Sequence, residues 1–281
     1  MALFSKNKND APTETVGFMH HLEALRWHLV RAAAAILFFS VFFFINKEFL
    51  FDDIIFAPRN PDFWTYRALC DFSHWLHLGE ALCISIQEIK IINTDLSGQF
   101  TMHMWAALVA GLVLGFPYLA WEMWRFIKPA LYDKEIKNTR GVVLAVSILF
   151  VVGVLFGYYI IVPLSLNFLA TYQITTAVQN YISMDSFISN VTTVALMSGV
   201  VFELPVVVYF LSLLGIMSPS FMRNYRRHAV VVILIVAAII TPSPDVTSQM
   251  LVAIPLYVLY EASIFVSMYV EKEKAKKAML L

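Results

Sequence analysis

A single acidic residue, Glu203, interrupts a long apolar stretch in the sequence Val200-Val-Phe-Glu-Leu-Pro-Val206. A carboxylate inside a bilayer costs about 3 kcal/mol or more, so such acids usually face a protein interior or a water-filled cavity. Two interpretations follow: a functional contact with cargo, a partner helix or water, or a neutral carboxyl bonded to a neighbouring helix. Pro205 removes a backbone donor and favours a kink beside the acid. Glu261 interrupts another apolar segment nearer its end, where function and simple interfacial pairing both stay open.

Two cysteines and two histidines form a second cluster of reactive side chains, with the spacing Cys70-x3-His74-x2-His77-x5-Cys83. Zinc accepts two thiolates and two imidazoles, but this order and spacing match no common zinc-finger pattern. Oxidising compartments favour disulfides, so we prefer a Cys70–Cys83 bridge to a metal site, with unpaired cysteines as the third possibility. Closing so short a loop would stabilise the surrounding segment by about 3 kcal/mol.

Enzyme motifs are absent from the sequence, which holds no Walker loop, no GxSxG and no HExxH. An intramembrane protease would need a serine and a histidine at matching depth. The histidines near the apolar segments, His28, His103 and His228, all lie close to segment ends. We therefore expect a protein without catalytic activity, cofactor or bound metal.

The composition sets the environment in which these residues must work. Of the 281 residues, 59% are hydrophobic and 14% are charged, whereas a soluble domain is about 45–50% apolar and about 25% charged. This excludes a soluble enzyme, a disordered chain and a disulfide-rich secreted module. Because a spanning helix needs about 20 apolar residues, we predict an all-α polytopic membrane protein in a single domain, residues 1–281. The six expected helices are approximately 27–45, 100–121, 141–166, 186–215, 225–240 and 250–270.

The fifth expected helix is short. Its unbroken apolar part, residues 229–240, rises only about 18 Å against a hydrocarbon core of about 30 Å. A re-entrant segment would fit these residues equally well. The charge distribution favours a span, because only an even number of spans keeps the basic C-terminal tail on the same side as the N-terminus.

Charge sorts sharply between the two sides of the membrane. Although the net charge is zero, 16 of the 20 basic residues lie at the N-terminus, in the connections after the second and fourth helices, and in the C-terminal tail. By the positive-inside rule these segments, and both termini, are expected in the cytoplasm. The external connection 46–99 holds eight acidic residues and is long enough to form a partly ordered cap. The first apolar run is too long for a cleavable signal, so the first helix should remain as an anchor.

Four segments, read in order, resemble the TatC family, the multispanning receptor of the twin-arginine translocation pathway. They are His21-Leu-Glu-Ala-Leu-Arg26, Gly115-Phe-Pro-Tyr118 continuing to Trp124-Arg-Phe-Ile-Lys-Pro-Ala-Leu-Tyr132, Phe202-Glu-Leu-Pro205, and Thr241-Pro-Ser-Pro-Asp245. Their order and spacing cover nearly the whole chain. The resemblance implies a six-helix, cup-shaped protein of the bacterial cytoplasmic membrane that works with TatB-type and TatA-type subunits in an oligomeric complex. It would recognise twin-arginine signal peptides on folded cargo, use the proton-motive force, and bind no nucleic acid.

The resemblance also assigns site residues. For signal-peptide binding it implies Glu135, Glu23, Arg26, Phe126 and Tyr132; for the intramembrane or partner contact, Glu203 and Pro205; for the external loops, Pro58 and Asp245. Guanidinium groups form bidentate, charge-assisted bonds with carboxylates, which suits an acid such as Glu135.

The first motif departs from the family pattern, which usually reads HLxELR. Ala24 stands where the family has glutamate, and Glu23 lies one residue earlier. One residue turns a helix by about 100°, so Glu23 points elsewhere. Either the helix start is rotated or frayed, or Glu135 carries more of the recognition. Glu23 could also act only as a first-turn acid that stabilises the helix N-terminus.

Two rival functions stay open at this level. An ion- or proton-coupled secondary transporter would use Glu203 as a proton carrier, although such proteins often contain repeats, and none is visible here. A purely structural assembly scaffold would need no cargo contact at all. Substrate flux by the protein alone would favour the transporter, and cargo crosslinking at Glu135 would separate a receptor from a scaffold.

Overall fold

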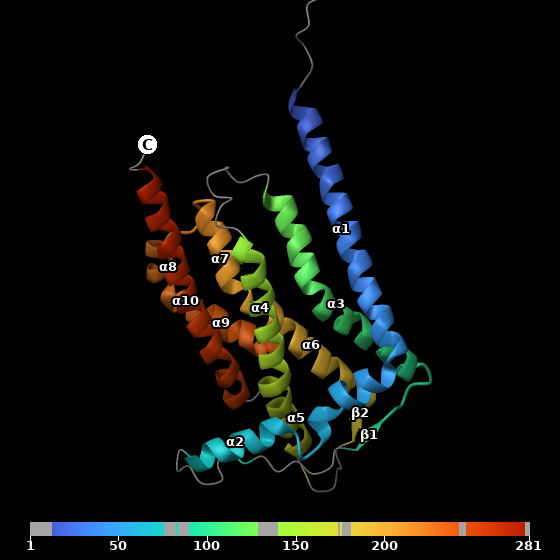
Figure 1. Ribbon diagram of the computed structural model, residues 1–281. Helices are drawn as coiled ribbons and strands as arrows, with labels where there is room; N and C mark the ends of the chain where they lie inside the picture. Colours follow the sequence, from blue (N-terminus) through green and yellow to red (C-terminus); the bar gives the residue numbers. More distant parts are fainter. Residues whose placement is uncertain are drawn as a thin grey trace, which may run out of the picture.

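The computed structural model describes residues 13–75, 83, 90–128, 140–173, 175, 181–241 and 246–278, and nearly all of these are helical (Figure 1). In chain order the elements are α1 (Thr13–Ile45), η1 (Phe49–Ile55), η2 (Ala57–Arg59), α2 (Trp64–Trp75), β1 (Ile91–Ile92), α3 (Gly98–Ile127), α4 (Arg140–Phe156), η5 (Gly157–Ile161), α5 (Val162–Thr171), β2 (Ile182–Ser183), α6 (Met184–Phe202), α7 (Leu204–Leu213), α8 (Pro219–Asn224), α9 (Arg226–Ile240) and α10 (Val246–Ala278).

Five helical stretches in the described residues are long and apolar enough to cross a membrane: 23–45, 98–127, 141–171, 184–213 and 248–276. They match the first, second, third, fourth and sixth expected helices, so the protein is a multi-pass membrane protein. Large apolar side chains on α1, such as Phe38 (70% exposed), face outward as lipid-facing residues do. At the position of the fifth expected helix lies α9, whose 15 residues are only about 22 Å long.

Two helices extend well beyond their apolar segments. Whereas the apolar pattern predicts a first helix from residue 27, α1 begins at Thr13, and α10 continues to Ala278 rather than ending near residue 270. The added residues are rich in Glu, Lys, Ala and Leu, which favour helix strongly. These charged extensions lie at one end of the bundle, where α1 begins and α3, α7 and α10 end (Figure 1). We call this end the basic end and the opposite one the cap end.

Small residues allow α1 and α3 to pack closely along their length. A Cβ atom added at Gly111 would lie 2.5 Å from the backbone nitrogen of Ser40, and one at Gly115 would lie 3.3 Å from the Cα of Ile36. Glycine pairs at this spacing let two membrane helices approach to backbone contact. The middle of α1, around Ile36 and Ser40, is therefore held close against α3.

The fourth expected helix is divided at Glu203 into α6 and α7. Pro205 lies in the first turn of α7, where its missing N–H causes no loss. The backbone N–H groups of Val206 and Val207 both donate to the carbonyl of Glu203, at 2.9 and 3.0 Å. The interruption that Pro205 suggested is thus present, and Glu203 lies at it.

Within the described residues the cap end holds ordered elements, as the length of the connection 46–99 suggested. It contains η1, η2, α2 and β1, and β1 pairs in parallel with β2, with Ile91 opposite Ile182. Pro58 is buried, and its carbonyl accepts a hydrogen bond of 2.7 Å from the Tyr66 hydroxyl. Burial raises the pKa of Tyr66 above its ordinary value, so this hydroxyl keeps its proton. The strand pair joins the cap to the start of α6, and the largest buried cluster includes cap residues such as Leu50, Ile55 and Tyr66.

Candidate functional site

The signal-peptide residues implied by the resemblance gather at the basic end, as far as the structure describes them. Glu23 and Arg26 are exposed on α1, and Ala24 between them is half-buried. Phe126 is half-buried near the end of α3, and its ring lies edge-on to that of His28, with centroids 6.2 Å apart. The α1 and α3 parts of the expected site are therefore adjacent. Tyr132 and Glu135 lie outside the described residues.

Glu122 is the residue at this end that the sequence reasoning missed. It is 1% exposed although it carries a carboxyl group near the end of α3. His28 of α1 approaches through Nδ1 at 2.5 Å from Oε2, and the Tyr118 hydroxyl donates to Oε1 at 2.9 Å. The guanidinium groups of Arg31 and Arg125 lie at 3.6 and 3.8 Å. A buried carboxylate must be paired and hydrogen-bonded to be tolerated, and these four partners meet that need.

The spacing of these partners contained a signal that could have identified the cluster. Tyr118, Glu122 and Arg125 follow one another at intervals of four and three residues, so they share a face of α3. His28 and Arg31 have the same relation on α1. The apolar pattern predicts a helix that ends at residue 121, which places Glu122 at the membrane surface. Glu122 was therefore not predicted to be a site residue.

Glu203 faces an apolar cavity of about 240 Å³ between α3, α4 and α7, lined by side chains such as Phe116, Val146 and Phe210. Its Oε1 atom is buried and makes no hydrogen bond within the described part of the chain. A buried polar atom without a partner is costly, so this oxygen is a natural acceptor for a donor from another molecule. Trp124 lines the same cavity and packs on Phe210, with ring centroids 5.5 Å apart.

Glu261 is engaged in a pairing contact, one of the two roles that the sequence left open. Arg226 at the start of α9 donates to its Oε2 at 2.7 Å, and the Tyr257 hydroxyl donates to its Oε1 at 3.0 Å. The ion pair joins α9 to α10. This ion pair does not involve α1, so a substitution of Glu261 can serve as the control for the same substitution of Glu122.

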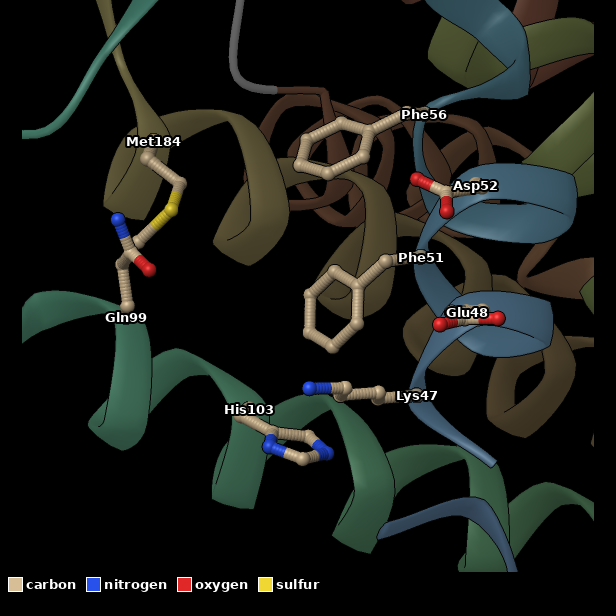
Figure 2. A pocket seen from close by; sticks show the side chains of 8 residues that line it. All are labelled: Lys47, Glu48, Phe51, Asp52, Phe56, Gln99, His103 and Met184. Carbon is tan, nitrogen blue, oxygen red and sulfur yellow. The ribbon is translucent and has the colours of Figure 1, made fainter. Parts of the chain in front are cut away.

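A separate cavity of about 290 Å³ opens at the cap end, between η1 and the first turns of α3 and α6. Figure 2 shows Lys47 beside His103 with the Phe51 ring above them; Asp52 lies on η1 and Glu48 directly before it. The His103 ring stacks on Phe44 with centroids 4.2 Å apart, and its buried Nε2 makes no hydrogen bond among the described residues. None of the expected site residues that the structure describes lines this cavity.

The cysteine–histidine cluster also lies at the cap end. Cys70 and Cys83 are joined by a disulfide, with their Cα atoms 4.3 Å apart. His74 Nε2 lies 3.9 Å from the Cys83 sulfur, and His77 lies outside the described residues. With both sulfurs bonded to each other, neither is available as the thiolate ligand that zinc requires. Asp245, expected in an external loop, also lies outside the described residues.

Replacing both Cys70 and Cys83 with serine is expected to destabilise the cap by about 3 kcal/mol, because the disulfide no longer limits the unfolded chain. The check is thermal unfolding in detergent with and without a dithiol reductant. The reductant should lower the melting temperature of the wild type to that of the variant and leave the variant unchanged. If a chelator destabilises the wild type and the reductant does not, the cluster is a metal site instead.

The family model described as Sec-independent protein translocase protein (TatC) matches residues 20–255. The TatC protein of Blattabacterium sp. subsp. Periplaneta americana is 37% identical over 268 residues, which are 95% of this chain and 98% of the relative. That of Aquifex aeolicus is 34% identical over 198 residues, 70% of this chain and 82% of the relative.

Two solved structures of the twin arginine translocase receptor TatC, one of them in DDM, are similar to this fold. Their TM-scores are 0.63 and 0.68, each at 30% identity, and they cover 89% and 88% of this chain and 99% of their own. The sequence and the fold thus agree over most of the chain. This chain therefore belongs to the TatC family of Sec-independent protein translocase proteins.

Proposed function

We propose that this protein is the signal-peptide receptor and core subunit of a twin-arginine translocase, which exports folded proteins across the bacterial cytoplasmic membrane with the proton-motive force. The observation that carries the proposal is the family match over residues 20–255, which includes every residue assigned to the site. The function is recognition and transport, without catalysis or a cofactor. A solved relative is itself described as a twin arginine translocase receptor.

Recognition begins in this proposal at the basic end. The two arginines of the signal dock against Glu135, with Glu23 of α1 as a second acid. Guanidinium groups suit this role because each can form two parallel hydrogen bonds to one carboxylate. Phe126 and Tyr132 border the site, and Arg26 lies beside Glu23. The exposure of Glu23 and Arg26 supports the proposal, because a peptide arriving from the cytoplasm can reach them.

The proposed topology has six spans with both termini in the cytoplasm, and α9 is the fifth. The basic residues of α1, α3, α8, α9 and α10 support this orientation under the positive-inside rule. A span as short as α9 leaves a hydrophobic mismatch, which the bilayer relieves by thinning. Thinning beside the protein would lower the barrier to the passage of folded cargo.

TatB-type and TatA-type subunits are the proposed partners, within an oligomeric complex in the bilayer. Glu203 and Pro205 mark the intramembrane contact: the cavity beside Glu203 is apolar except for the carboxyl, and its buried Oε1 is unbonded within the described residues. A polar residue on a partner helix, or on the inserted cargo, would satisfy this oxygen. Pro58 and Asp245 belong to the external loops of the same family pattern.

Photocrosslinking tests the proposed function directly. A photoreactive amino acid is placed at Phe126, at Trp27 or, as a distant control, at Phe265, which is 66% exposed on α10. A precursor with a twin-arginine signal should crosslink at positions 126 and 27 about tenfold more than one with twin lysines, because lysine lacks the bidentate fork. Equal labelling by the two precursors, or labelling only at position 265, would contradict the receptor function.

A further inference from the structure

The beginning of α1 projects from the bundle at the basic end (Figure 1). The beginning of α1 extends beyond the end of α3 (Figure 1), and Glu23 and Arg26 are both exposed on α1. A projecting helical segment takes its direction from the last contact that holds it. In the part of α1 whose side chains the structure describes, His28 makes the first hydrogen bond to another helix: it reaches the buried Glu122, two residues after Arg26 and five after Glu23.

The contacts of Glu122 are not equal in strength. Arg31 and Arg125 are 47% and 48% exposed, at 3.6 and 3.8 Å from the carboxylate, and such exposed pairs contribute little. Arg125 also lies over the Trp121 ring, 4.9 Å from its centroid. His28 is 15% exposed and lies at 2.5 Å. The bond between Glu122 and His28 is therefore the shortest and the most buried of these interhelical contacts of Glu122.

The same bond lies beside the residues proposed for signal recognition. Phe126 follows Glu122 by one turn on α3, and its ring meets the His28 ring. The chain then leaves α3 after Ile127 toward the connection that carries Glu135. A shift of α1 at His28 would move Glu23 and Arg26 relative to Phe126.

We propose that Glu122 and His28 form an interhelical clamp that positions the α1 half of the twin-arginine site against its α3 half. Glu122 is a positioning residue in this inference: it acts through His28 and the direction of α1 and does not touch the signal. The inference rests on the proposed receptor function for its consequence. Its geometric content, a fixed distance between the basic ends of α1 and α3, can be tested without any signal peptide.

The test uses the full chain in lipid nanodiscs with four variants: Glu122→Gln, His28→Gln, the double variant, and Glu261→Gln. The last one removes the charge of the other ion-paired carboxylate, between α9 and α10, and is the matched control. Spin labels on cysteines at Trp27 (56% exposed) and Lys128 (exposed) report the α1–α3 distance. Binding of twin-arginine and twin-lysine signal peptides is measured per folded molecule, beside the melting temperature.

The clamp predicts that Glu122→Gln broadens the distance distribution and weakens twin-arginine binding about tenfold, a typical coupling between sites. The binding of twin-lysine peptides by Glu122→Gln should equal that of the wild type. Glu261→Gln should match the wild type in both the distance distribution and peptide binding. His28→Gln should have the same effect as Glu122→Gln, and the double variant should be no worse than either single one, because both residues act through one bond. If Glu122→Gln fails to fold, the His28→Gln variant still tests the clamp.

Two results would overturn the clamp. One is an unchanged distance distribution in the variants; the other is a lower melting temperature with twin-arginine binding intact, which would make Glu122 a purely stabilising residue. Failure of the proposed function looks different. In that case the wild type itself would not distinguish twin arginine from twin lysine, while the distance measurement would still decide whether the clamp exists.

Discussion

Replacing Glu203 with leucine is expected to abolish export and yet leave the protein at least as stable as the wild type. The carboxyl lies at the break between α6 and α7, faces an apolar cavity, and keeps one buried oxygen without a hydrogen bond among the described residues. Leaving such an atom unpaired costs about 1–3 kcal/mol, so an apolar side chain should raise the free energy of unfolding by about 1 kcal/mol. Polar groups retained at this cost commonly serve function.

Export is measured in cells whose only TatC is the variant, and stability is measured by thermal unfolding of the purified protein. Glu203→Gln keeps a hydrogen-bonding group of the same size and should retain part of the activity. Val206→Ile, which changes the lining of the same cavity without changing its polarity, is the control and should export normally. If Glu203→Leu exports normally, no polar contact is needed there. If the protein unfolds more easily, Glu203 is bonded within the fold and the cavity is not a docking place.

The long apolar helices could be predicted from the sequence because their signal is local. About 20 consecutive apolar residues are enough to recognise a span, and each of the five stretches in the structure has that length. The break at Glu203 was also foreseeable, since Pro205 cannot donate to the preceding turn. α9 is different: its 15 residues are shorter than the membrane core, so its role as a span depends on the thickness of the bilayer around it.

The contacts between distant segments could not be predicted in the same way. Glu122 is buried because His28, 94 residues earlier in the chain, reaches it from another helix, and hydropathy along one segment carries no information about that neighbour. The pairing of Ile91 with Ile182 joins strands of only two residues, too short to show an alternating pattern. The Cys70–Cys83 disulfide is an exception, because the sequence holds only two cysteines and they lie 13 residues apart.

Replacing Glu135 with glutamine is expected to weaken binding of a twin-arginine signal by about 10- to 100-fold. The estimate follows from the loss of a charge-assisted hydrogen bond, about 1.5–3 kcal/mol, at about 1.4 kcal/mol for each factor of ten. Twin-lysine binding should change much less, because a lysine offers a compact charge and no bidentate fork. Asp95→Asn makes the same acid-to-amide change at an exposed position at the cap end and should leave binding unaltered.

Binding is measured with labelled signal peptides at two salt concentrations, with the amount of inserted protein held equal. The effect of Glu135→Gln should shrink as salt rises, since screening weakens exposed ion pairs. Equal twin-arginine binding by the variant and the wild type would remove Glu135 from the site. Glu23→Gln decides between the two explanations of the Ala24 departure. A smaller loss than for Glu135→Gln means that the connection after α3 carries most of the recognition, whereas a larger loss means that α1 presents Glu23 to the signal despite the shift of one residue.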